Sequence, residues 1–198
     1  MPKARELRAR ARQNLGGHIF ANKWLILMLG CVLVDIISSA AAATGVLLLI
    51  ITGPLTVGLA NAFLKQVRLP DSPVEVDDYT VSLRGDNVAR TIILGLLKTL
   101  FLFLWSLLFV IPAIVKSYAY AISEYLLLDH PEYTSTQCID ESRRIMRGNK
   151  WRLFCLDLSF LGWYIVGMLC FGVGVIFVTP YHQMARAHFY EALLSGEQ

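Results

Sequence analysis

Charged residues are scarce in this chain, and the short motifs that mark many enzyme families are missing. Only 17% of its 198 residues are charged and 56% are hydrophobic, whereas a soluble domain has about 25% charged and about 45–50% apolar residues. The sequence contains no His-Glu-x-x-His, Gly-x-Ser-x-Gly or P-loop motif. The composition predicts a protein surrounded by lipid, and nothing in the sequence indicates an enzyme.

The four cysteines form no pattern that is typical of a disulfide framework or a zinc site. There is no Cys-x-x-Cys pair and no histidine at ligand spacing. Cys31, Cys155 and Cys170 lie in apolar runs, whereas Cys138 lies in a polar, basic segment. We expect three core residues and one free cytosolic thiol, with no disulfide, metal or cofactor.

Three long apolar stretches are each long enough for two membrane helices of roughly 20 residues. They are residues 24–66, 88–129 and 150–194. Each stretch has an uncharged break near its middle, at residues 43–45, 111–112 and 172–174. The sequence therefore predicts an all-α membrane protein, with six transmembrane helices arranged as three helical hairpins in a single domain.

The basic residues indicate how these hairpins are oriented. Nearly all of them lie in three clusters, at residues 3–23, 65–90 and 143–152, and outside the clusters there are only Lys98, Lys116 and Arg186. Basic residues that flank membrane helices stay in the cytoplasm. We therefore expect a multi-pass protein with both termini in the cytoplasm. A nucleic-acid binder would not alternate basic patches with apolar runs of membrane length.

Two alternatives remain open at this point. The first apolar run follows basic residues, as in a secretory signal peptide. The basic region is longer than a signal peptide needs, and Asp35 interrupts the run, so an uncleaved first span is favoured. Four spans with interfacial helices are the other alternative, because residues 175–194 are rather polar.

A basic amphipathic segment, residues 1–23, precedes the first hairpin. In it Leu7, Ala11 and Leu15 recur at a spacing of four residues, with arginines between them. This spacing places the three apolar side chains on one face of a helix. Basic amphipathic helices lie in the headgroup region of an anionic leaflet, and we expect this helix to do the same.

A second basic amphipathic helix is expected over residues 132–149, before the third hairpin. Thr134 and Gln137 have the spacing of a capping box, and Gly148 provides a stop. The candidate residues for binding an anionic lipid headgroup are Arg143, Arg144, Arg147, Lys150 and Arg152. The alternative is that these side chains only fix the topology.

The cytoplasmic loop at residues 67–87 is acidic. Its carboxylates are Asp71, Glu75, Asp77, Asp78 and Asp86. Their spacing lacks the alternation and the final glutamate of a calcium-binding EF-hand loop. This loop is expected either to pack on the cytoplasmic face or to bind a protein partner.

The first and third hairpins resemble one another in sequence. Asn22-Lys23-Trp24 begins one and Asn149-Lys150-Trp151 begins the other, and Pro54 and Pro180 follow at nearly the same distance. A tripeptide with matched downstream spacing is typical of an internal repeat. We predict a threefold repeat of helical hairpins.

Ionisable side chains at membrane depth are costly, and they mark candidate functional sites. Lys116, Tyr120 and Glu124 recur every four residues and are predicted to form one polar stripe that faces inward. His182, Arg186 and Tyr190 have the same spacing. The candidates for lining a ligand site are Lys116, Tyr120, Glu124, Asp157, Arg186, Asp35 and Lys98.

Among these candidates the acids and bases balance, which suggests ion pairs such as Asp35 with Lys98 or Lys116. The alternative is that the stripes are buried structural networks, or that the long side chains extend towards the membrane interface.

Several stretches resemble a known family, the bacterial integral membrane proteins called domain of unknown function 975. They are residues 111–120, 142–154, 156–163 and 185–190. Ala113 stands where that family has glycine. The resemblance implies a bacterial plasma-membrane protein, of a kind typical of Firmicutes, with no established activity and no catalytic residues to assign.

The leading hypothesis is a non-enzymatic membrane protein that binds or transports a small or lipidic ligand between its hairpins. The alternative is an accessory or immunity-type protein that acts through a membrane-protein partner. Small residues at helix positions, such as Gly167 and Gly174, would permit a homo-oligomer.

Overall fold

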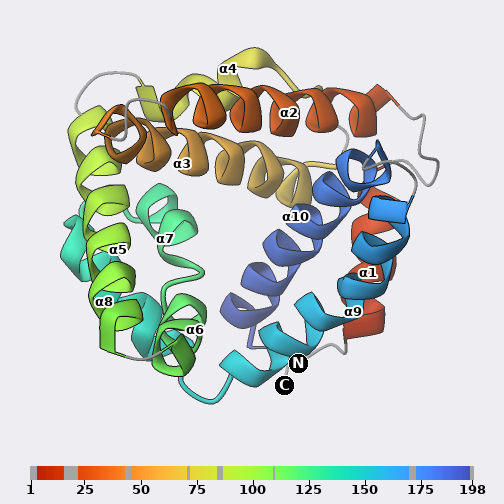
Figure 1. The fold of residues 1–198 in the computed structure, drawn as a ribbon. Helices are drawn as coiled ribbons and strands as arrows, with labels where there is room; N and C mark the ends of the chain where they lie inside the picture. Colours follow the sequence, from red (N-terminus) through yellow and green to blue (C-terminus); the bar gives the residue numbers. More distant parts are fainter. Residues whose placement is uncertain are drawn as a thin grey trace. The chain divides into compact units, whose positions relative to one another are not determined.

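The structure is a computed structural model, and it describes residues 4–15, 22–42, 46–70, 72–83, 87–108, 110–169 and 173–196. All regular structure within these ranges is helical (Figure 1). The elements are α1 (Ala4–Asn14), α2 (Asn22–Ala42), α3 (Val46–Arg68), α4 (Val76–Thr80), the 3₁₀ helix η1 (Val81–Leu83), α5 (Asn87–Leu108), α6 (Val110–Ala119), α7 (Ser123–Asp129), α8 (Ser135–Ile145), α9 (Lys150–Leu169) and α10 (Val173–Leu194). The predicted all-α fold class is confirmed.

The chain divides into two compact units. Unit 1 comprises Met1–Leu33, Ala62–Glu75 and Trp151–Gln198, and unit 2 comprises Val34–Asn61 and Val76–Lys150. Helices α2 and α3 therefore each contribute one part to unit 1 and another part to unit 2. The single domain expected from the sequence consists of two packing units.

Two helices of the described part of the chain are long and apolar enough to cross a membrane. They are α5, over Val88–Leu107, and α9, over Lys150–Leu169. Only 11% of the first segment and 22% of the second are buried inside the protein. The predicted turn at residues 43–45 lies outside the described residues, and so does Gly172 of the third turn.

In unit 1, α9 and α10 form an antiparallel pair of helices. Their backbones approach most closely at Gly167 and Gly174, where a Cβ atom added to Gly167 would lie 2.8 Å from the Val175 nitrogen. A Cβ atom added to Gly174 would lie 2.5 Å from the Gly167 Cα. Only glycine permits this approach, because any side chain would force the two backbones apart.

Helix α1 packs against α10 within the same unit. The three apolar residues predicted to share one face, Leu7, Ala11 and Leu15, are at most 2% exposed. The predicted helix is confirmed, but this apolar face packs against protein. It is therefore not the face that would enter a lipid leaflet.

In unit 2, α5 runs antiparallel to α6 and α7, which together replace the single fourth span predicted from the sequence. Helix α6 ends at Ala119, and a turn at residues 120–122 leads into α7. The Tyr120 N–H bonds to the carbonyls of both Lys116 and Ser117, at 3.1 and 3.3 Å, which is the tightening common where a helix ends. Pro112 lies in the first turn of α6, where proline is tolerated.

Helix α8 has the cap predicted from its sequence. The Thr134 side chain accepts a hydrogen bond from the Gln137 N–H, and the Gln137 side chain accepts one from the Thr134 N–H. After the helix, Gly148 adopts a φ of +82°, a backbone conformation that favours glycine. The buried face of α8, which includes Cys138, packs on α5 and α7.

Part of the predicted acidic loop is helical, while Asp71 and Asp86 lie outside the described residues. Helix α3 continues to Arg68, and α4 then begins at Val76. Asp78 is only 7% exposed, and its backbone carbonyl accepts a hydrogen bond of 2.8 Å from the Asn61 side chain. This carboxylate is therefore not available on a free surface for binding a partner.

Candidate functional site

The predicted stripe of Lys116, Tyr120 and Glu124 faces α5 in unit 2. Glu124 pairs with Lys98, with 2.5 Å between a carboxylate oxygen and Nζ. One turn away along α5, the rings of Phe101 and Tyr120 lie 6.2 Å apart between centroids. Glu124 and Tyr120 therefore each contact a residue of α5.

Lys116 makes the third of these contacts. Its Nζ lies 4.5 Å from the centre of the Trp105 ring, within the range of a cation–π interaction. On α5 the partners lie at positions 98, 101 and 105, which share one helix face. The antiparallel pairing thus brings two of the predicted candidates, Lys98 and Glu124, into direct contact.

Arg143 of α8 closes this cluster from a third helix. One guanidinium nitrogen donates to the Tyr120 hydroxyl at 2.8 Å, and another donates to Asp140 at 2.9 Å. The hydrogen bond to Tyr120 raises the pKa of Arg143 above its usual value. Arg143 was predicted to bind lipid headgroups, but the structure shows it interacting with protein groups.

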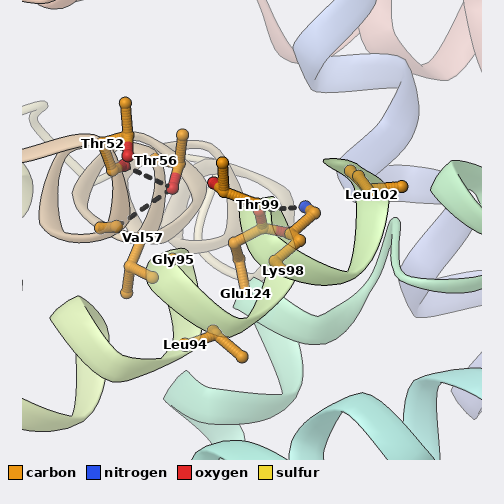
Figure 2. A pocket seen from close by; sticks show the side chains of 10 residues that line it. Thr52, Thr56, Val57, Leu94, Gly95, Lys98, Thr99, Leu102 and Glu124 are labelled. Carbon is orange, nitrogen blue, oxygen red and sulfur yellow. Dashed lines mark hydrogen bonds and ion pairs between the residues drawn. The ribbon is translucent and has the colours of Figure 1, made fainter. Parts of the chain in front are cut away.

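A partly open cavity of about 180 Å³ borders the Lys98–Glu124 pair. We call it the α3–α5 cavity. Its lining residues come from α3, α5 and α7, and they are Thr52, Gly53, Thr56, Val57, Leu94, Gly95, Lys98, Thr99, Leu102 and Glu124. Figure 2 shows the α3 threonines on one side of the cavity, with Lys98 and Glu124 joined on the other.

Gly53 and Gly95, which line the cavity, lie where α3 and α5 are in close contact. A Cβ atom added to Gly53 would lie 2.1 Å from the Thr91 carbonyl oxygen, and one added to Gly95 would lie 2.5 Å from the Gly53 Cα. The hydroxyl of Thr56 donates to the carbonyls of Thr52 and Gly53, at 2.8 and 3.0 Å. The threonines and the ion pair thus place polar groups in a wall that is otherwise apolar.

Two further candidates, Asp157 and Arg186, meet in unit 1 and form a separate network. The Arg186 guanidinium binds both carboxylate oxygens, at 3.1 and 2.5 Å. His182 Nε2 lies 2.7 Å from one of these oxygens, and the Tyr164 hydroxyl lies 3.1 Å from His182 Nδ1. Both oxygens of Asp157 are therefore engaged by neighbouring side chains.

The ion pair suggested between Asp35 and either Lys98 or Lys116 is absent from the described residues. Asp35 is exposed, and within the described part of the chain it does not pair with Lys98, which instead binds Glu124. Lys116 likewise lies over an indole ring and not beside Asp35. The balance of acids and bases does not predict which of them pair, because pairing depends on which helix faces pack together.

The remaining headgroup candidates differ in their surroundings. Arg144 pairs with Glu141 on its own helix, at 2.5 Å, and this hydrogen bond lowers the pKa of Glu141. Arg147 and Arg152 are exposed, and Lys150 is half-buried. Of the five predicted residues, these three have no side-chain ion pair within the described ranges.

The sequence reasoning left out several residues of both sites. Tyr164 lies seven residues after Asp157, and hence on the same face of α9. Thr52 and Thr56 are spaced four residues apart on α3 in the same way. This helical spacing could have identified these residues as sharing a face with one another or with a charged residue. It does not predict which helix faces pack against each other.

No site for a metal ion is found in the described ranges, where no three His, Cys, Asp or Glu side chains gather. Cys31, Cys138 and Cys155 form no disulfide. Cys138 is fully buried, and burial raises its pKa to about 11. The thiol predicted to be free in the cytosol is therefore enclosed by protein.

The chain was compared with protein families, curated proteins and solved structures. No curated protein and no solved structure matches it. One family model matches twice, over residues 1–116 and 107–197, and together the two matches cover nearly the whole chain. The chain therefore belongs to the family described as Protein of unknown function (DUF975).

Proposed function

We propose that the chain is a multi-pass protein of a bacterial plasma membrane, with six spans and both termini in the cytoplasm. Large apolar side chains on the surface support this topology. On α5, Phe103 and Leu107 are 65% and 73% exposed, and on α9 Met168 and Leu169 are 72% and 78% exposed. A soluble protein would rarely leave so much apolar surface in water, whereas lipid tails accept it.

The positions of the basic clusters support the same topology. Arg147 and Arg152 flank the start of α9 and are exposed. Trp151, between them in sequence, is 70% exposed, and tryptophan is enriched at membrane interfaces. In this arrangement the start of α9 lies at the cytoplasmic surface, close to anionic headgroups.

We further propose that the protein is not an enzyme and that it binds a small ligand in the α3–α5 cavity. The observation that carries this proposal is the Lys98–Glu124 pair in the cavity wall. The two side chains are 23% and 12% exposed, although burying charges among apolar helices is costly. Both charged side chains line the cavity, so a ligand that enters it can bind them. A membrane transporter or a ligand sensor would bind its ligand in this way.

Native mass spectrometry of the protein released from nanodiscs of its own lipids tests this function without assuming a ligand. The wild type should retain one defined small molecule per chain. Thr99→Phe, which places a ring in the cavity lining, should lose that molecule.

The matched control is Leu100→Phe, because Leu100 is 55% exposed and does not line the cavity. This variant should retain the molecule. Equal retention by both variants, or a bare wild-type chain, would contradict ligand binding. The accessory role through a protein partner would then become the better explanation.

A further inference from the structure

The charges in the lining of the α3–α5 cavity cancel. Among the described residues that line it, Lys98 and Glu124 are the only ionisable ones, and they bind each other at 2.5 Å. The other lining residues are threonine, glycine, valine and leucine. The cavity therefore has a positive group and a negative group next to one another and no net charge.

This balance restricts the ligands that can use the pair. A ligand with one negative charge that bound Lys98 would leave Glu124 without a partner, and a cation that bound Glu124 would leave Lys98 without one. Removing one partner from a poorly solvated ion pair is strongly unfavourable. We expect this to weaken binding by about a hundredfold.

The threonines add acceptors on the opposite side of the cavity. The Thr56 hydroxyl hydrogen is shared between two backbone carbonyls. Its oxygen can still accept a hydrogen bond, since a hydroxyl has two acceptor lone pairs. An ammonium group, with several hydrogens to donate, suits a site that offers both a carboxylate and a hydroxyl oxygen.

The size of the cavity limits the ligand further. Its volume of about 180 Å³ equals roughly six water molecules at about 30 Å³ each. A molecule of roughly six to ten non-hydrogen atoms fits this space. Most drug-sized ligands need a larger pocket, of about 300–1,000 Å³.

We propose that the α3–α5 cavity binds a small zwitterion of the amino-acid class. Its carboxylate binds Lys98 and its ammonium group binds Glu124, with the ligand inserted between these two side chains. This inference rests on the proposed ligand-binding function and specifies the ligand class. Because each protein charge exchanges one partner for another, no charge is left unpaired.

The test uses wild-type protein in nanodiscs and an equimolar mixture of the small aliphatic amino acids. Native mass spectrometry should show one member of the mixture bound per chain. Titration calorimetry then compares that member with its analogues that lack the amino group or the carboxylate. For alanine these analogues are propionate and ethylamine. Both should bind at least about a hundredfold more weakly.

Variants of the pair separate the role of charge from that of folding. Lys98→Met and Glu124→Gln should each lose the zwitterion. The exchange variant Lys98→Glu/Glu124→Lys keeps a neutral pair and should bind better than either single variant. Thermal unfolding in the same nanodiscs identifies any variant that fails to fold, and the analogue comparison on the wild type needs no variant.

Three other results would overturn the inference. If a singly charged analogue binds as tightly as the zwitterion, the charge argument is wrong. If Thr99→Phe displaces only a lipid or a neutral molecule, the cavity binds a ligand of another class, and the proposed function stands without the inference. If the wild type binds nothing, both proposals fail.

Discussion

Units 1 and 2 each contain an antiparallel pair of helices that carries opposite charges on facing sides, but the charges are used differently. In unit 1 both oxygens of Asp157 are bound, by Arg186 and His182. In unit 2 Glu124 has one ion-pair contact, with Lys98, beside a cavity. The two carboxylates are similarly buried, at 14% and 12% exposed, so the units differ in how many groups engage the carboxylate and in the cavity beside Glu124. From this we infer a structural role for the Asp157 network and a binding role for the Lys98–Glu124 pair.

The largest effect expected from this comparison is on stability. Asp157→Leu removes three hydrogen bonds and leaves Arg186 without its carboxylate, which should lower the free energy of unfolding by about 3–5 kcal/mol. Glu124→Leu removes one ion-pair contact and should cost less, about 1.5–3 kcal/mol. Unfolding in detergent micelles, followed by circular dichroism, measures both.

The double variant Asp157→Leu/Arg186→Leu supplies the control for the first prediction. Because it leaves no unpaired charge, it should recover part of the stability lost in Asp157→Leu. Equal losses for Asp157→Leu and Glu124→Leu would remove the distinction between a carboxylate with several partners and one with a single ion-pair partner.

The glycine contacts provide the next largest effect, and here the two units should behave alike. Gly167→Ala in unit 1 and Gly95→Ala in unit 2 each place a methyl group within 2.8 Å of backbone atoms. Forcing the helices apart should cost about 1–3 kcal/mol in each case. The measurement is again the unfolding free energy in micelles.

Gly162 is the matched control, because a Cβ atom there would meet nothing within 4 Å. Alanine has a higher helix propensity than glycine, so Gly162→Ala should be neutral or stabilise α9 by up to about 1 kcal/mol. If Gly167→Ala were equally harmless, the close approach of α9 and α10 would be wrong.

A smaller effect on the free energy of unfolding is expected where Arg143 of α8 contacts Tyr120. Arg143→Met removes the hydrogen bond to the Tyr120 hydroxyl and should cost about 0.5–1.5 kcal/mol, because Arg143 is 36% exposed and water screens its charge. Arg144→Met removes only the ion pair with Glu141, in which Arg144 is 72% exposed. Its cost should be below about 0.5 kcal/mol. The two unfolding curves would coincide if Arg143 were a surface residue like Arg144.

The sequence predicted local features well and contacts between helices poorly. The capping box at Thr134 was predicted correctly, because it depends on residues within one turn of a helix. Lys116, Tyr120 and Glu124 were predicted to lie along a single helix, but the structure places them in α6, in the turn that follows and in α7. The apolar face of α1 was also identified. Its partner, α10, lies over 150 residues away in sequence, and no local pattern indicates which surface covers that face.

The candidate site shows the same limit. Lys98 and Glu124 were both predicted as lining residues, because charges are rare in the apolar runs. Their pairing with one another was not predicted, and neither was the cavity, because Gly53 and Gly95 must first bring α3 and α5 together. The threefold repeat, the six spans and their orientation stay predictions, since they concern copies and surroundings that packing within each unit does not test.

The smallest effect concerns the chemical labelling of one buried thiol, that of Cys138. Cys138 is fully buried and its pKa is raised to about 11 by burial, so at pH 7.4 almost none of it is the reactive thiolate. N-ethylmaleimide should leave Cys138 unmodified in the folded protein and modify it after unfolding in SDS. Peptide mass spectrometry at pH 7.4 and pH 9 measures both. Because the raised pKa keeps the thiol protonated at both pH values, labelling of the folded protein should stay low at pH 9. Rapid labelling of folded Cys138 would mean that α8 does not pack on α5 and α7, and the contact between Arg143 and Tyr120 would then have to be abandoned as well.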